Sequence, residues 1–338
     1  MATDRGAGYR VAFFGAMSLL AREVRNHLDE MAFPVRSMHL YDTGDHEGSM
    51  TEYAGEAMIV THAEEELVTI SDIAFVCGED DPRSDLYLDW STRGGGGVAF
   101  DLAGASRSRS DVPVVNCEVN AEVMRSAGRV FAAPHPMAQP LSTILHRIGA
   151  AFTLVEASGT ILRPASDFDE AGIEELHHQA VGLLSFSEIP TEVFGRQIAF
   201  NVAPVSLQEI AGGALAERVR QDVLRVLAGR SLPLSVRILQ APIFHGHCYS
   251  IRAVLDGSPP RGAIEEALEI AGSISISRGG DGRTPAELAT ESGIWIGEIA
   301  PDRSRPGALW IWAVADAIRS GAALNAARMA EKVVEILA

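Results

Sequence analysis

The chain has 338 residues, 47% hydrophobic and 22% charged, which is long enough for two domains with a sizeable core. Its 28 Lys and Arg residues against 45 Asp and Glu residues give a net charge of -17, which argues against a nucleic-acid partner. The chain has no apolar run of membrane-spanning length and no secretory signal pattern at its start. We therefore expect a cytoplasmic protein with no membrane partner.

The first 130 or so residues alternate apolar runs with helical periodicity. The run YRVAFFG at 9–15, the helical pattern at 19–31 and the run at 37–42 predict a βαβ opening. Further apolar runs bounded by Gly, Asp or Pro predict more strands, at 56–62, 71–78, 97–103 and 112–116. We expect an open, largely parallel α/β sheet of the Rossmann-like type, which binds ligands at its carboxyl edge.

The rest of the chain predicts an α+β domain with a mostly antiparallel sheet. Helical patterns start at Leu141 and cover 169–186, and an Ala-rich helix ends the chain at 322–338. The predicted strands are longer apolar runs, at 152–158, 196–204, 234–255 and 309–317.

A dinucleotide-binding turn is one reading of Gly15–Ala21, between the first strand and the first helix. A Rossmann turn has three glycines that let the backbone approach a pyrophosphate, whereas this turn keeps Gly15 and has the small residues Ser18 and Ala21. Asp42 ends the second strand, where an acid would hold a ribose 2′-hydroxyl. A strand-to-helix turn that binds no nucleotide stays the alternative.

The stretch AAPHPMAQPLSTIL, Ala132–Leu145, reads as a loop entering an amphipathic helix. A helix N-terminus stabilises an anion or a nucleophile through its unpaired N–H groups and partial positive charge. The turn itself contains no Cys, Ser or Lys. The three cysteines, Cys77, Cys117 and Cys248, are scattered without a C-x-x-C pattern, which predicts reduced thiols rather than disulfides or a zinc site.

The segment LWIWAVADAIRSGAALNAARMAE, Leu309–Glu331, resembles the closing segment of aspartate-semialdehyde dehydrogenases. The segments AFNVAP, DEAGIEELHHQ, APIFHGH and DVPVVNCEVN resemble that family at collinear places. The resemblance implies a Rossmann-like NAD(P)-binding domain over 1–134 with the C-terminal helix 318–338, and a dimerisation and substrate domain over 135–317. It also implies a homodimer; an unknown protein partner is a further possibility.

In that family an acyl phosphate is reduced with NADPH through a cysteine thioester. A His acts as acid and base, one Arg holds phosphate and another holds the substrate carboxylate. The resemblance places His247, in HGH, at the acid–base position and Arg107, in DLAGASR, at the phosphate position. On an extended strand, His247 would share a face with His245 and Tyr249 while Cys248 points away. His245 and His247 are at ligand spacing, but no third ligand is evident and we expect no metal site.

The same resemblance marks several losses. The nucleophile position falls on Ala138, or on Met137 with a slip of one residue, and neither forms a thioester. The carboxylate-binding Arg is replaced by Gln240, which cannot supply a charge-assisted pair. The family's glutamine falls on Val155 or Glu156, beside Ser158 and Gly159.

Cofactor positions differ too. The Arg that would grip a 2′-phosphate corresponds to Asp45, and the acids Glu79 and Asp80 occupy a turn expected near pyrophosphate. The resemblance implies that NAD or NADP binds. Because Asp45 would repel a 2′-phosphate, we expect NAD rather than NADP, with Asp42 on the ribose.

Three functions stay open. The chain is a cysteine-less paralogue of the Usg type, unable to form the thioester and serving a binding, regulatory or subunit role. Alternatively, it is an oxidoreductase on another aldehyde or acyl substrate, with His247 as acid or base. In the third reading it is an aspartate-semialdehyde dehydrogenase with a relocated thiol such as Cys117.

Overall fold

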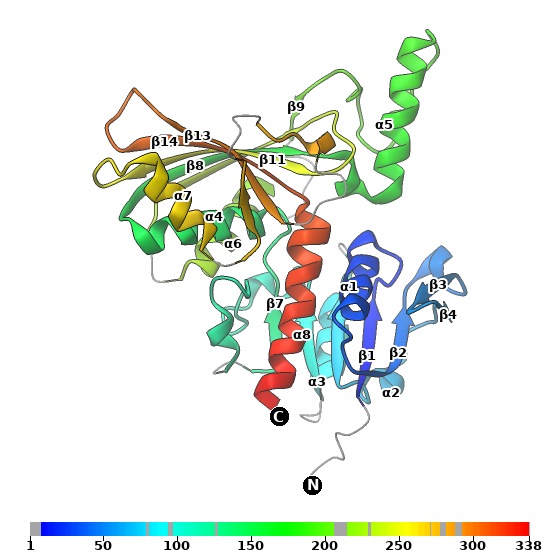
Figure 1. Ribbon diagram of the computed structural model, residues 1–338. Coiled ribbons are helices and arrows are strands. Elements are labelled where there is room, and N and C mark those ends of the chain that lie inside the picture. The colour runs from blue at the N-terminus through cyan, green and yellow to red at the C-terminus, as the bar shows by residue number, and fades with distance from the viewer. Residues whose placement is uncertain are drawn as a thin grey trace. The chain divides into compact units, whose positions relative to one another are not determined.

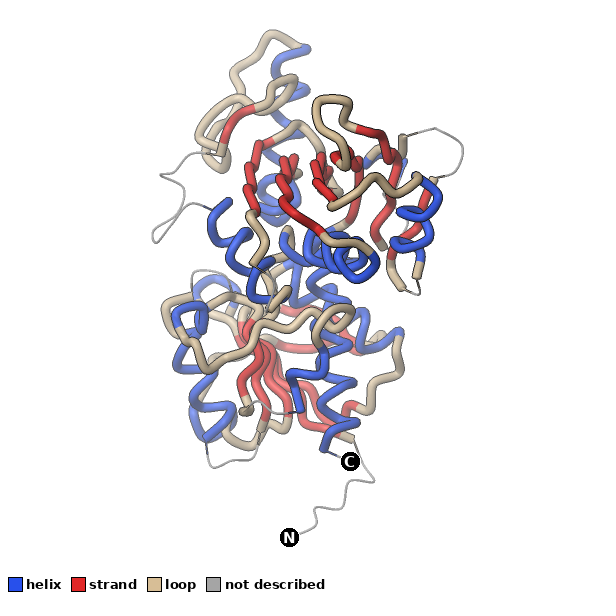
Figure 2. The backbone as a smooth tube through the Cα atoms, turned by 90° about the vertical axis from the view of Figure 1, so that its left-hand side faces the viewer, coloured by secondary structure: helices blue, strands red, loops and turns tan. Residues whose placement is uncertain are grey.

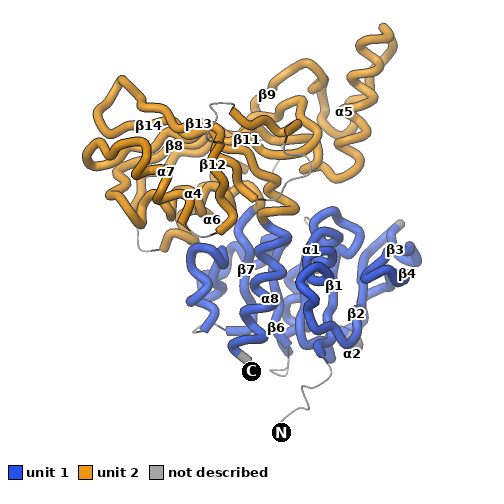
Figure 3. Tube along the Cα trace, in the orientation of Figure 1, with its two compact units in different colours: residues 1–135, 322–338 blue, residues 136–321 orange. Residues whose placement is uncertain are grey.

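The computed structural model describes residues 8–78, 81–93, 97–125, 128–205, 215–228, 231–270, 272–277, 282–287 and 293–337. It divides into two compact units, Met1–His135 with Ala322–Ala338, and Pro136–Gly321 (Figure 3). Among these described residues, no helix is long and apolar enough to cross a membrane.

Unit 1 is built on a five-stranded parallel sheet in the order β2-β1-β5-β6-β7 (Figures 1 and 2). Its strands are β1 (Tyr9–Phe14), β2 (Val35–Tyr41), β5 (Ile73–Val76), β6 (Val98–Asp101) and β7 (Val130–Ala132). The register aligns the last residues of all five strands in one row across the sheet. Loops that follow these strands therefore share one edge, where open parallel sheets bind ligands.

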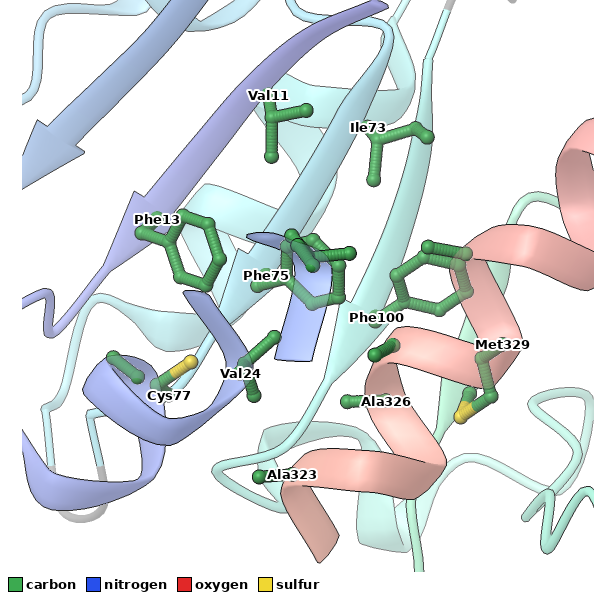
Figure 4. Close-up of a cluster of buried hydrophobic side chains, with 14 of the residues drawn as sticks. Val11, Phe13, Val24, Ile73, Phe75, Cys77, Phe100, Ala323, Ala326 and Met329 are labelled. Carbon is green, nitrogen blue, oxygen red and sulfur yellow. The ribbon is translucent and has the colours of Figure 1, made fainter. Parts of the chain in front are cut away.

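Helices cover both faces of this sheet. On one face, α1 (Leu19–Glu30) and α8 (Leu324–Leu337) join a core with Phe13, Phe75 and Phe100 (Figure 4). On the other face, α2 (Glu65–Val68) and α3 (Ser84–Thr92) supply Val68 and Leu88. Both faces are apolar because each strand of a parallel sheet is buried on both sides.

Two predicted strands of unit 1 do not join the parallel sheet. The run at 56–62 gives β4 (Glu56–Ile59), which pairs antiparallel with β3 (Met50–Tyr53) in a separate hairpin. Among the described residues of this run, Thr61 makes a single parallel bridge to Tyr41 of β2, while most of β4 is exposed.

The run at 112–116 makes only a single bridge, Val114 to Ala132, and β7 supplies the fifth strand instead. Here the Asn120 side chain hydrogen-bonds the backbone of Asn116 and Val114. A side chain that pairs with the backbone competes with the strand ladder.

Unit 2 contains a seven-stranded sheet in the order β12-β13-β14-β11-β8-β10-β9. Its strands are β8 (Leu154–Arg163), β9 (Ala203–Pro204), β10 (Leu234–Gln240), β11 (His247–Leu255), β12 (Ile274–Ile276), β13 (Ile294–Pro301) and β14 (Ala308–Ala315). The pairs β8–β10 and β12–β13 are parallel and the other four pairs are antiparallel. The predicted fold class, a Rossmann-like part and a mostly antiparallel α+β part, is confirmed.

Helices α4 (Ala138–Ala151), α6 (Leu215–Val226) and α7 (Arg261–Glu269) pack together on this sheet (Figure 1). Helix α4 starts three residues before the predicted Leu141, with Pro140 in its first turn. Proline is tolerated there because the first helical N–H groups have no partner within the helix.

Helix α5 (Asp169–Leu184) fixes the loop that follows it. The buried Glu175 accepts hydrogen bonds from the backbone N–H groups of Val193 and Phe194, and Gln179 accepts from those of Ile198 and Ala199. The predicted strand at 196–204 is therefore limited to β9, because these N–H groups bind side chains instead of a neighbouring strand.

Candidate functional site

The turn after β1 lies at the carboxyl edge of the parallel sheet. Gly15 has a φ of 69°, and a Cβ there would overlap the backbone of Gly78. Ser18 caps α1: its hydroxyl accepts a 3.2 Å hydrogen bond from the Ala21 N–H and donates a 2.8 Å bond to the Gly15 carbonyl. The turn is thus close-packed, and its first glycine is required by the fold.

Asp42 follows β2 at the same edge. Its carboxylate accepts hydrogen bonds from the N–H groups of Met17, at 2.9 Å, and Thr43, at 2.8 Å. Each oxygen keeps a further lone pair that can accept a hydroxyl. The carboxylate is therefore held beside the turn and suits a ribose hydroxyl better than a phosphate. Glu79, Asp80 and the Asp45 side chain lie outside the described part of the chain.

Arg107 lies in the loop after β6. The loop is shaped by buried Asp101, which accepts hydrogen bonds from the N–H groups of Gly104, Ala105 and Ser106 and from the Ser106 hydroxyl. Gly104 has a φ of 78°, and the Arg107 guanidinium lies directly against it. This contact explains why the loop has Gly at that place.

A buried Arg beneath the β1 turn has no counterpart in the sequence predictions. Arg25 of α1 is 2% exposed, and its Nη1 donates a 2.8 Å hydrogen bond to the Ala16 carbonyl. Burial lowers the pKa of its guanidinium. Its place among the buried residues of α1, beside Ala21, Val24 and Leu28, is the sequence signal that it has.

In unit 2, helix α4 begins at the predicted nucleophile position. Met137 and Ala138 are fully buried, and no side chain caps the helix. The Tyr249 hydroxyl donates a 3.3 Å hydrogen bond to the Met137 carbonyl, which fixes the turn against β11. The helix start therefore presents a methyl group and a thioether side chain, neither of which is a nucleophile.

His247 is the first residue of β11 and is 1% exposed. Its Nε2 lies 3.0 Å from Asp167 Oδ1 and 3.1 Å from Oδ2. Its Nδ1 is buried and has no hydrogen-bond partner among the described residues. The prediction that His245 shares a strand face with it is wrong, because β11 starts after His245, which is exposed.

Asp167 also binds Arg163, the last residue of β8. The Arg163 Nε donates a 3.0 Å hydrogen bond to Asp167 Oδ2. Arg163 is the register partner of Gln240 at the end of parallel β10. The Gln240 amide nitrogen donates to the carbonyls of Arg163, at 3.1 Å, and Ala241, at 3.4 Å. Arg163 and Asp167 thus meet Gln240 and His247, about 80 positions further along the chain, at the ends of three strands.

Val155 and Glu156, the predicted glutamine positions, lie elsewhere. Glu156 pairs with Val254 near the far end of β11 and forms ion pairs with Arg252 and Arg305. Seven residues of extended strand separate it from Arg163, or roughly 23 Å. Neither Val155 nor Glu156 therefore lies beside His247, whereas Arg163 shares Asp167 with it.

None of the three thiols lies in an activating environment. Burial raises the pKa of Cys117 and of Cys248 to about 12, and raises that of Cys77 still further. Cys77 lies in the apolar core of unit 1 (Figure 4), and Cys248 packs against Val314. Cys117 is fixed by Asn325 of α8, whose side-chain oxygen accepts a 2.8 Å hydrogen bond from the Cys117 N–H. A protonated buried thiol is inert as a nucleophile.

Comparison with known proteins agrees with this architecture. Residues 10–127 match the family model "Semialdehyde dehydrogenase, NAD binding domain". The chain is 24% identical to an aspartate-semialdehyde dehydrogenase of Rickettsia bellii, over 97% of this chain and 98% of the relative. It is 27% identical to a USG-1 protein homolog of Pseudomonas aeruginosa, over 96% and 97% of the two chains.

A solved structure also matches the chain over almost its whole length. Aspartate semialdehyde dehydrogenase II of Vibrio cholerae, crystallised as a complex with ASA, is similar with a TM-score of 0.89 and 25% identity. The match covers 97% of this chain and 98% of that one.

Proposed function

We propose that the chain is a Usg-type member of the aspartate-semialdehyde dehydrogenase family, which binds a dinucleotide and a small ligand without forming a cysteine thioester. The observation that carries the proposal is the start of α4, where the buried residues are Met137 and Ala138. A thioester requires a thiolate at the reacting carbon, and this turn supplies none.

The raised pKa values of the thiols support the same proposal. A relocated nucleophile would need a lowered pKa and a base within hydrogen-bond reach. Cys117 instead has a pKa raised to about 12 by burial. Cys248 is next to His247 in sequence, yet its side chain packs with Val314 among apolar groups on the opposite face of the strand.

For the cofactor, we propose NAD rather than NADP. The tight turn at Gly15, the capped start of α1 and the Asp42 carboxylate fit an adenosine ribose with a free 2′-hydroxyl. Asp42 would repel a 2′-phosphate. When bound, the nicotinamide supplies or accepts a hydride.

The proposal is tested by assaying phosphate-dependent NAD(P)H formation from aspartate semialdehyde. We expect no turnover from the natural chain, and alkylation of its cysteines should change nothing. Ala138→Cys places a thiol at the start of α4, and Ala150→Cys, at an exposed position of the same helix, is its control. Natural-chain turnover that alkylation of one cysteine abolishes would overturn the proposal.

A second candidate is direct reduction of a carbonyl substrate, favoured by the buried pair of His247 and Asp167. Asp167 holds the Nε2–H, so that a protonated imidazole would release its Nδ1 proton to the carbonyl oxygen as a hydride reaches the carbon, giving an alcohol. A panel of small aldehydes with NADH tests it. His247→Gln should abolish any turnover, and turnover that survives this change would exclude the assignment.

We also propose a homodimer formed through the seven-stranded sheet. Support comes from Trp310 of β14, which is 41% exposed although β14 lies next to the central strand β11. Sedimentation equilibrium should give twice the chain mass of 36.1 kDa, and a monomer at every concentration would contradict it.

A further inference from the structure

The Arg163 guanidinium is fixed in place on one side and unused on the other. Its Nε is bound to Asp167 at 3.0 Å, and its central carbon lies 4.0 Å from the centroid of the Phe168 ring. Within the described parts of the chain, Nη1 and Nη2 have no hydrogen-bond acceptor. The side chain is 15% exposed, and neither terminal nitrogen is among the fully buried atoms that lack a partner, so a ligand can reach both.

An Arg held in this way is prepared for two-point recognition. The planar guanidinium presents its two terminal nitrogens as a fork that matches both oxygens of a carboxylate. The ion pair and the ring contact have already restricted the rotation of the side chain, so less conformational entropy is lost when a ligand binds.

Gln240 does not perform this role. Its amide nitrogen donates to two backbone carbonyls, and its Oε1 is buried without a partner among the described residues. The site thus lacks a cation at the end of β10. Arg163, the register partner of Gln240 on β8, provides a cation instead.

We propose that Arg163 binds the carboxylate of a small carboxylic-acid ligand beside His247. Asp167 links the two positions, because it binds Arg163 through Nε and His247 through Nε2. This assignment deepens the proposed function by naming the class of ligand at the same site.

Charge balance favours a carboxylate over a phosphate. Arg163 and Asp167 together carry no net charge in a largely buried place, with side chains 15% and 8% exposed. A single carboxylate group places one negative charge on the guanidinium beside Asp167, whereas a phosphate group places up to two there. Uncompensated buried charge is costly, so the smaller charge is the better fit.

The test is titration of the full chain with succinate, L-aspartate and inorganic phosphate, followed by calorimetry. We expect succinate or L-aspartate to bind more tightly than phosphate. Arg163→Gln should weaken that binding about 100-fold, since a charge-assisted bidentate pair is lost. Arg237→Gln, at an exposed position of β10, is the matched control and should bind as the natural chain does.

Arg163→Lys covers the case in which the Gln variant fails to fold. It keeps the charge beside Asp167 but loses the fork, and should weaken carboxylate binding about tenfold. Unchanged affinity in this variant, tighter binding of phosphate, or no binding of either carboxylate would overturn the assignment. None of these outcomes depends on thioester turnover, so the inference and the proposed function fail separately.

Discussion

His247 Nε2 lies 3.0 Å from Asp167 Oδ1, and the two residues are 80 positions apart in the chain. The hydrogen bond is to Oδ2, at 3.1 Å, and because a carboxylate only accepts hydrogen bonds, the pairing places a ring hydrogen on Nε2 and leaves the buried Nδ1 as the nitrogen that Asp167 does not bind.

Loss of the Asp167 charge should destabilise unit 2. Asp167→Asn keeps the shape but removes the ionised acceptor shared by Arg163 and His247. We expect the free energy of unfolding to fall by about 2–3 kcal/mol, measured by urea denaturation. Asp256→Asn, at an exposed position after β11, should change it by less than about 0.5 kcal/mol. Equal effects in the two variants would show that the Asp167 contacts add nothing.

The native thiols should resist labelling in the folded protein. With pKa values of about 12, Cys117 and Cys248 have a thiolate fraction at pH 8 that is roughly 1000-fold below that of a thiol with the ordinary value of 9.0. Reaction with a disulfide reagent should be slow until urea unfolds the chain. Rapid labelling of one thiol in the native protein would reveal an activated cysteine.

The same thiols should make stability depend on alkaline pH. A folded pKa above the unfolded value means that the unfolded chain releases its protons first, so stability is constant below about pH 9 and falls between pH 9 and 12. Cys117→Ala with Cys248→Ala should flatten that fall in a series of urea midpoints. If the fall in stability has the same slope in the double variant, other titrating groups cause that fall.

Gly15 should be irreplaceable for two reasons that can be separated. Open space surrounds Gly44, so Gly44→Ala introduces only the strain of a positive φ. It should lower the free energy of unfolding by about 1 kcal/mol. Gly15→Ala adds overlap with the backbone of Gly78 and should cost roughly 3 kcal/mol or more. Urea denaturation measures both, and similar losses would mean that the Gly78 contact relaxes freely.

Asp42 should set the cofactor preference. Asp42→Asn should weaken NADH binding about tenfold and reduce the preference over NADPH, because a charged acceptor for the ribose hydroxyl is lost. Glu47→Gln, at an exposed position nearby, is the control. Ligand-induced stabilisation measures the effect, since a ligand at 100 times its Kd adds about 2.7 kcal/mol. Tighter binding of NADPH than NADH by the natural chain would contradict the assignment.

Local pattern was sufficient for the fold class. Apolar runs and helical periodicity report burial along a single segment, so the βαβ opening and the Ala-rich terminal helix followed from sequence. The runs at 56–62 and 112–116 misled because an apolar run does not say whether its N–H groups pair with a neighbouring strand. In the run at 112–116, the Asn120 side chain hydrogen-bonds the backbone in place of a neighbouring strand.

By itself the sequence determined which residues are present at the start of α4, and so the lack of a thiol there. Only the tertiary structure decided that Arg163, Asp167, Gln240 and His247 share one place, because parallel pairing of β8 with β10 and antiparallel pairing of β8 with β11 align the ends of these strands. Strand pairing joins residues about 80 positions apart through long-range hydrogen bonds, and local sequence propensity does not specify which strands pair.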